Sequence, residues 1–237
     1  MSDKSRRVRR YAWETFAVVS GILIAFALDA GWNEYREARE LRESLEVLRS
    51  EFRDSRVQLD SVIAVNERAI AATLMAFSAS PEEISGLSQD SAFRLLQGLN
   101  RSDTFNPSQT AIQALIGVNV LEQIPDPALR AGVAAWSGAL EDLAEEQVEV
   151  RRMDARVRDF VAESGVGADF HMVPMSDWIA GTSTLDVVAV LEEFAANDPS
   201  ARLFAARRTA VELMLLEQTG VSERIDDILA ILDAELR

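Results

Sequence analysis

Few residues in this chain of 237 have side chains that can perform catalysis. His171 is the only histidine and cysteine is absent, which excludes thiolate catalysis and cysteine-based metal centres. His171 lies near Asp169 and has the chemistry of a general base or a metal ligand, although most lone histidines bond only to nearby groups. No Glu-x-x-His pair accompanies it, so a di-iron bundle would lack its ligands. We therefore expect no catalytic residue, no metal and no cofactor.

The charged clusters offer a second kind of chemistry, the binding of ions. Acidic pairs such as Asp226-Asp227 lack the alternating spacing and the glycine of a calcium loop. The arginines within 151–158 alternate with acids at intervals of three and four, which favours pairing within one helix over anion binding. With 39 acidic and 24 basic residues the net charge is −15, and this disfavours a nucleic-acid partner.

One predicted loop is rich in aromatic and methionine side chains, which are typical of binding surfaces. This candidate partner surface comprises Phe170, His171, Met172, Met175 and Trp178. The alternative is a loop that Trp178 anchors to the body of the protein.

The N-terminal region predicts a membrane anchor. No charged residue lies between Glu14 and Asp29. A helix over residues 11–32 would be about 33 Å long, enough to cross the roughly 30 Å of hydrocarbon in a bilayer. Trp13 and Trp32 mark its two ends, as aromatic residues do at membrane interfaces. Glu14 and Asp29 lie about one turn inside these ends, where a carboxylate reaches headgroup water or protonates.

Basic residues cluster before this segment, whereas the charges after it are evenly mixed. The cluster consists of Lys4, Arg6, Arg7, Arg9 and Arg10. The positive-inside rule then places residues 1–10 in the cytoplasm and residues 33–237 in the periplasm, with the anchor in the bacterial inner membrane. A cleaved signal peptide is the alternative, because the basic stretch, the apolar core and Ala25-Phe26-Ala27 resemble its three regions; the domain would then be secreted. A buried helix of a soluble protein is a third interpretation.

The anchor also carries a resemblance. Glu14, the stretch Gly21-Ile22-Leu23-Ile24-Ala25 and Trp32-Asn33-Glu34 resemble the GE…GILIA…WNE anchor of an uncharacterised family of bacterial single-pass membrane proteins, although Trp13 stands where that family usually has glycine. The stretch from Phe105 to Arg130 is similar to a later part of the family. The resemblance implies one N-terminal transmembrane helix and a helical extracytoplasmic domain, and it implies no activity.

Beyond the anchor, the pattern of apolar residues predicts one long helix. Steps of four and three from Leu41 to Ala76 meet an apolar residue at eight of eleven positions, the exceptions being Ser55, Asn66 and Thr73. No proline interrupts the pattern before Pro81. A continuous helix from Tyr11 to about Phe77 is therefore expected.

Two more long helices are predicted by their end signals. Asp126-Pro127 begins one that Gly165 ends, and Asp198-Pro199 begins another with an expected break at Gly220. Shorter helices are expected over 81–98, 107–122 and 184–196, and residues 78–125 are expected to cap the far end of the bundle. Because β-type alternation is nowhere sustained, we predict an all-α fold with a single helical-bundle domain after the anchor.

The apolar stripe of the first helix can pack in two ways. It can pair with a second copy, with Asn66 fixing the register, or it can pack against later helices of its own chain. We favour packing within the chain, because closing the short loops between antiparallel helices costs little entropy. In the anchor, Ala17, Gly21 and Ala25 recur every four residues, a spacing that permits close helix pairing.

An anchor, a bundle and no catalytic set together favour a non-enzymatic protein that acts as an interaction scaffold, a sensor or an accessory subunit of an envelope complex. Its expected partners are the lipid bilayer and another envelope protein or a second copy. One alternative is a bundle that binds a ligand or metal, or acts as an enzyme, through carboxylates and His171. The other is a coiled-coil homo-oligomer.

Overall fold

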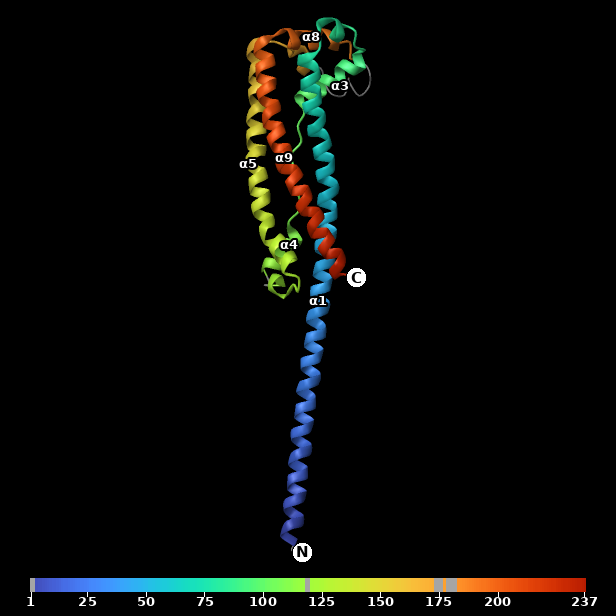
Figure 1. Cartoon of the computed structure of the whole chain (residues 1–237), viewed down its shortest axis with the longest axis vertical. Coiled ribbons are helices and arrows are strands. Elements are labelled where there is room, and N and C mark those ends of the chain that lie inside the picture. Colours follow the sequence, from blue (N-terminus) through green and yellow to red (C-terminus); the bar gives the residue numbers. More distant parts are fainter. Residues whose placement is uncertain (1–2, 118–119, 173–176, 178–182) are drawn as a thin grey trace.

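A computed structural model shows one very long helix whose C-terminal half joins a helical bundle (Figure 1). It describes the backbone of residues 3–117, 120–172, 177 and 183–237, and the side chains of the same residues apart from 3–18, 120, 171 and 172. Every regular element in these ranges is a helix, which confirms the all-α prediction.

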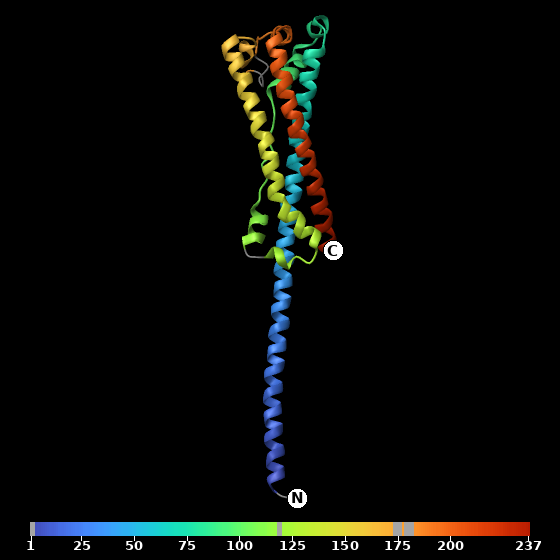
Figure 2. The same cartoon turned by 60° about the vertical axis from the view of Figure 1, so that its left-hand side comes forward.

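The long helix α1 runs from Asp3 to Ser78 without a break. This confirms the predicted continuous helix and extends it at the N-terminus. It ends just before Ser80-Pro81, because a proline disfavours helical geometry in the residue before it. The lower part of α1 stands clear of all other elements, and the upper part packs into the bundle (Figures 1 and 2).

Helix α5 spans Pro127–Ser164, as its end signals predict. The Asp126 carboxylate accepts hydrogen bonds from the N–H groups of Ala128 and Leu129, at 2.6 and 3.0 Å, and so caps the first turn. At the other end Gly165 adopts a φ of 75° and closes the helix with a bond from its N–H to the Val161 carbonyl.

Helix α9 spans Asp198–Glu235 and corrects two details of the prediction. Its cap is Asn197, whose side chain accepts from the Ser200 N–H at 3.0 Å, rather than Asp198. The helix also passes Gly220 unbroken. A glycine inside a helix costs only about 1 kcal/mol, and packing of α9 against both α1 and α5 outweighs that cost.

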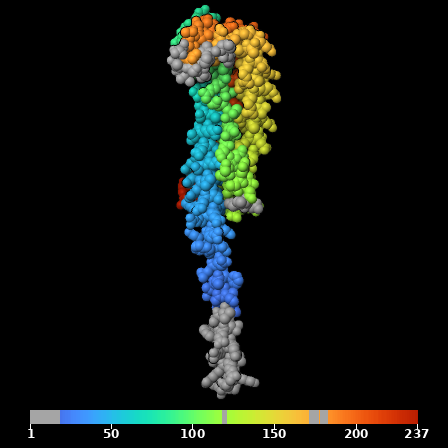
Figure 3. All heavy atoms as spheres, turned by 180° about the vertical axis from the view of Figure 1, so that it is seen from behind, coloured from blue at the N-terminus to red at the C-terminus, as the bar shows by residue number. Residues whose placement is uncertain are grey.

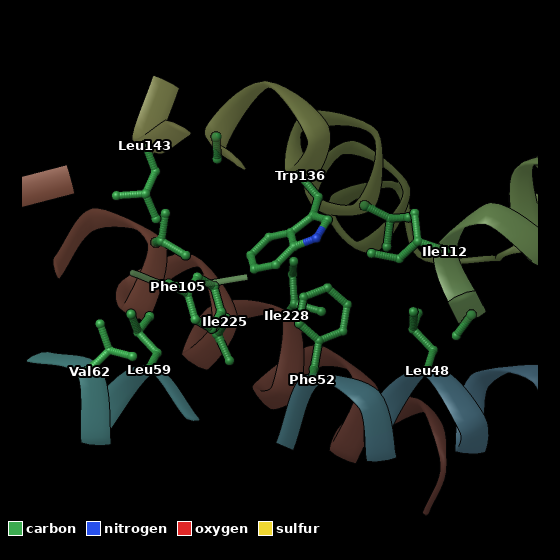
Figure 4. Packing of buried hydrophobic residues seen from close by; sticks show 14 of the residues in the cluster. Leu48, Phe52, Leu59, Val62, Phe105, Ile112, Trp136, Leu143, Ile225 and Ile228 are labelled. Carbon is green, nitrogen blue, oxygen red and sulfur yellow. The ribbon is translucent and has the colours of Figure 1, made fainter. Parts of the chain in front are cut away.

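The three long helices form the body of the bundle. α1 and α5 run in the same direction away from the projecting helix, and α9 returns antiparallel between them (Figure 2). Near the base, the Phe52 and Trp136 rings meet edge to face with centroids 4.9 Å apart, and Ile225 and Ile228 of α9 fill the space around them (Figure 4). This arrangement confirms the preference for packing within the chain.

The polar exceptions in the α1 stripe are also buried. Ser55, Asn66 and Thr73 are each at most 4% exposed. Salt bridges flank the same interface, from Arg53 to Asp233 at 2.8 Å and from Arg56 to Asp226 at 2.9 Å. The heptad stripe of α1 is therefore filled by helices of its own chain.

The shorter helices begin later than predicted or are divided. The segment predicted over 81–98 forms α2 (Pro81–Ser85) and α3 (Gln89–Asn100), because Ser88 provides a second cap by accepting from the Ser91 N–H. The prediction over 107–122 is replaced by α4 (Thr110–Gly117) and the 3-10 helix η1 (Val120–Gln123). Among the described residues, the remaining short helices are α6 (Ala168–Met172) and α8 (Val187–Ala196), and Asp186 caps α8.

The prediction that residues 78–125 cap the far end is wrong for the second half of that segment. Residues 101–109 leave α3 without helical structure and run back along the bundle between α1 and α5 to its base, where α4 lies (Figure 3). The Glu51 carboxylate of α1 accepts from the Ala111 N–H and so caps α4 from another helix. A partner 60 residues away decides where this helix begins, so no local pattern indicates it.

Candidate functional site

The projecting part of α1 exposes an apolar segment on all sides. Ile22, Leu23, Ile24, Phe26 and Leu28 are between 51% and 71% exposed. Successive helical residues are about 100° apart, so these positions surround the helix rather than forming one stripe. No single helix face could bury them all.

All residues from 21 to 32 of the predicted anchor are exposed. Trp32 is 62% exposed and its ring lies 6.1 Å from that of Tyr35. Asp29 is exposed, and a Cβ added at Gly21 would meet no atom within 4 Å.

Among the residues the structure describes, no helix is sufficiently long and apolar to cross a membrane. The predicted span starts at residue 11, and side chains before Val19 lie outside that description. They include those of Arg6, Arg7, Arg9, Arg10, Trp13 and Glu14.

A charged section of α1 joins the apolar segment to the bundle. Three exposed ion pairs, each between residues four apart, follow each other every three residues: Arg36–Glu40 at 3.6 Å, Arg39–Glu43 at 2.9 Å and Arg42–Glu46 at 3.5 Å. A section of helix that is mostly polar is typical of a connection between domains, and such pairs stabilise it. The helix therefore continues from the apolar segment into the bundle without a break.

The predicted partner surface is only partly described. Phe170 lies in α6 at the far end, half-buried, with its ring 6.2 Å from that of Phe93 in α3. It packs against a second apolar cluster, which includes Leu96, Leu99 and Phe194, rather than facing solvent freely. His171 and Met172 belong to α6 but their side chains lie outside the description, as do Met175 and Trp178 entirely.

The acidic and arginine clusters do not assemble a centre in the described part of the chain. No group of three or more His, Asp or Glu residues there is close enough to hold a metal ion. In the arginine cluster, Arg152 pairs with Glu149 of the same helix at 2.6 Å, as predicted. Asp154 instead pairs with Arg207 of α9, also at 2.6 Å.

Two groups of buried polar side chains lie between the long helices. Asn66 falls on the predicted stripe of α1, whereas the burial of Arg207 and Gln218 was not predicted. The Arg207 side chain is only 1% exposed, and Ser102 donates to the second oxygen of Asp154 at 2.9 Å. Nearby along the bundle, Asn66 donates to Gln218 and to the Asp103 carbonyl. The burial of Arg207 and Gln218 could have been predicted from the sequence. Both residues fall on the stripe of buried positions, at steps of three and four, that runs from Phe204 to Leu232 of α9.

The structure also contains a groove that no single segment of the sequence could reveal. It lies between α1 and α3 near the far end and has a volume of about 530 Å³. Small residues form its floor: a Cβ on Gly98 would come within 2.5 Å of the Ala72 Cβ, so the two helices touch there. Apolar side chains line its walls, among them Val65, Met75 and Leu95.

Three arginines also line this groove, which we call the α1–α3 groove. They are Arg68, Arg94 and Arg101, and no Asp or Glu lines it with them. A second, smaller hollow continues it toward the far tip and shares Met75, Leu87 and Leu95.

No protein-family model, no curated protein and no solved structure matches this chain. The resemblance of its N-terminus to the anchors of bacterial single-pass membrane proteins therefore stays a prediction.

Proposed function

We propose that this protein is a membrane-anchored, non-enzymatic scaffold. Residues 11–32 of α1 span the bacterial inner membrane, residues 1–10 are cytoplasmic, and residues 33–237 form a periplasmic bundle that binds another envelope protein.

The ring of exposed apolar side chains on the projecting helix carries this proposal. A second helix or a coiled coil covers one face of a helix, whereas lipid covers every face. Positions 22–28 are apolar around the circumference and are not covered by any described part of the chain, so a bilayer suits them better than a coiled-coil partner. Trp32 then lies at the lipid–water boundary, where tryptophan is enriched.

The continuity of α1 sets how far the bundle stands from the membrane. Leu45, the first fully buried core residue, lies 13 positions after Trp32, or about 20 Å along the helix. The Arg–Glu pairs keep this section helical, so a partner bound to the bundle would be held at a fixed distance from the lipid. The same continuity suits a sensor, since a rotation of the bundle would turn the anchor.

The absence of native cysteine permits a direct test of topology. Ser5→Cys and Ser50→Cys place single thiols on the two sides of the predicted span. In spheroplasts, a membrane-impermeant maleimide should label Ser50→Cys, and should label Ser5→Cys only after permeabilisation. Protection of both thiols would place the bundle in the cytoplasm. If the mass of the purified protein showed that the first 25 to 30 residues were missing, the segment would be a cleaved signal peptide.

A matched pair of variants tests whether the apolar ring is the anchor. Leu23→Arg together with Ile24→Arg should move the protein into the carbonate-soluble fraction, because a charge at the centre of a span costs about 2.5–3.5 kcal/mol. Val57→Arg, at a position of the bundle that is 72% exposed, should leave it in the membrane fraction. Equal fractionation of the two would contradict the proposed anchor.

A further inference from the structure

We propose that the α1–α3 groove is the docking site for an amphipathic helix of a partner protein, and that acidic residues flank the apolar face of that helix. The inference deepens the proposed scaffold function and rests on it, but it is tested independently of the membrane.

The shape of the groove suits a helix. Its lining runs along α1 from Val65 to Met75, and the hollow that continues it reaches Ala79, a length of about 21 Å or four helical turns. Two packed helices present a natural groove for a third, and small floor residues allow an axis to approach to about 8–10 Å. Ala71, Ala72 and Gly98 supply that floor.

Part of the apolar surface of the groove is not covered by the chain itself. Met75 is 49% exposed, and Leu87 and Leu95, which also line the groove, are only partly buried. Leucine-type side chains at helical spacings i, i+3 and i+7 would cover these surfaces, as in other helix-in-groove complexes.

The charge of the groove indicates which side chains should lie beside the apolar face of the bound helix. Arg68 donates its Nε–H to the Ala64 carbonyl and makes no ion pair within the described residues. Arg94 and Arg101 pair with Asp90 and Asp103, but all four side chains are at least 36% exposed, and such solvated pairs are weak. In a chain of net charge −15, these three arginines line a groove that has no lining carboxylate, and Glu83 lines only the hollow that continues it. The groove therefore forms a local site for acidic side chains.

Other occupants fit these observations less well. Arg68 lies 36 residues beyond Trp32, or about 54 Å along α1, so headgroups of the anchoring membrane cannot reach it. A second copy of the chain carries the same −15 charge and is repelled at long range. A single fatty acid would leave one side of its chain in water, because only two helices wall the groove.

The test uses the purified full-length protein in detergent and fluorescence anisotropy of a labelled 15-residue peptide. The peptide carries leucines at i, i+3, i+7 and i+10 with glutamates beside them, and a scrambled peptide of the same composition is the control. We expect the ordered peptide to bind at least tenfold more tightly than the scrambled one, and to bind more weakly as sodium chloride is raised.

Three variants locate the binding. Ala71 is exposed on the floor, so Ala71→Trp fills the groove without disturbing the core, and it should weaken binding at least tenfold. Arg68→Glu with Arg101→Glu should do the same by reversing the charge. Arg158→Glu, on an exposed face of α5, changes the net charge in the same sense and should leave the affinity unchanged.

Four outcomes would overturn the inference. These are equal binding of the scrambled peptide, binding that is insensitive to Ala71→Trp, saturable binding of dodecanoate without binding of the peptide, and self-association that Ala71→Trp abolishes. The last two would assign the groove to a small amphiphile or to a second copy. Because detergent replaces the bilayer, none of these outcomes depends on the topology test, so the two proposals can fail separately.

Discussion

At the scale of single residues, buried polar side chains hold the non-helical segment 101–109 against the bundle. Asn66 donates to the Asp103 carbonyl at 2.9 Å and accepts from the Asp103 N–H at 3.0 Å, so one side chain replaces the hydrogen bonds of a helix. Gln147 of α5 donates to the Phe105 carbonyl at 3.2 Å in the same way. Without these amides, the backbone of the segment would be buried and unsatisfied, at a cost of about 1–3 kcal/mol for each group.

The buried pair Arg207–Asp154 predicts an asymmetric response to mutation. Asp154→Ala leaves an almost fully buried guanidinium without its carboxylate and should lower the free energy of unfolding by about 3–5 kcal/mol. Arg207→Met should cost less, about 1–2 kcal/mol, because the remaining Asp154 is 22% exposed and can be hydrated. Urea unfolding measures both, with exposed Asp159→Ala as a control that changes little. Equal losses for the two variants would contradict the burial described for Arg207.

The cap of α8 predicts a dependence of stability on pH. A hydrogen bond from the Gln89 side chain, followed by one from the Ala189 N–H, lowers the pKa of Asp186 from its ordinary 3.8. A lowered folded-state pKa contributes stability that is present above 3.8 and is lost as the pH falls through the lowered pKa. The urea midpoint of Asp186→Ala should therefore lie below that of the wild type at pH 7, and the two should converge as the pH falls below 3.8.

The Gln89→Ala variant is the control for this pH effect. It removes the largest cause of the lowered pKa while leaving the carboxylate in place. Its stability should fall less steeply with acid than that of the wild type. An unchanged acid dependence would show that Gln89 does not set the pKa of Asp186.

At the scale of elements, local signals fix the ends of the long helices, whereas two of the short ones, α4 and α8, also depend on distant contacts. Asp126 caps α5 through bonds that span two or three residues. Glu51 caps α4 across 60 residues, and Gln89 donates to the cap of α8 across 97. A short helix forms too few hydrogen bonds to hold itself, so its ends follow the surface it packs on.

The turn after α5 predicts different effects for two similar glycines. Gly165 and Gly167 both have positive φ, 75° and 68°, but only Gly167 faces a ring: a Cβ there would lie 2.1 Å from the ring of the buried Phe194. Gly165→Ala should cost about 1–2 kcal/mol from backbone strain alone. Gly167→Ala should cost about 1–3 kcal/mol more, because the core around Phe194 must shift. Thermal or urea unfolding gives the comparison, and equal effects would show that Phe194 does not pack on this turn.

At the scale of the whole molecule, the projecting helix and the bundle are energetically separate. All residues described from 21 to 40 are exposed, and the first link of α1 to the end of the chain is the bond from Arg42 to the Leu236 carbonyl at 2.7 Å. Since burial supplies most of the stability of a helix, the bundle should not depend on what precedes residue 39.

Deletion of residues 1–38 tests this separation. The shortened protein should be soluble and monomeric, and its urea unfolding free energy should match that of the full chain in detergent to within about 0.5 kcal/mol. The control deletion, of residues 1–52, also removes core residues such as Leu45, Leu48 and Phe52 and should prevent folding. A large loss of stability from the shorter deletion would mean that the projecting helix packs on the bundle.

The sequence by itself determined the all-α class, the unbroken α1, and the ends of α5, because these depend on periodicity and on hydrogen bonds between residues close in the chain. Its apolar N-terminal stretch also predicted a membrane span, which stays a prediction; in the structure the residues from Ile22 to Leu28 are exposed.

Only the tertiary structure decided where residues 101–109 run, which groups the buried polar residues bond to, and that a groove exists. The partners of Asn66 lie 37 and 152 residues away, and Arg68 meets Arg94 and Arg101 only once α3 lies on α1. The physical reason is that burial and long-range hydrogen bonds depend on which surfaces meet, and no pattern within a single helix carries that information.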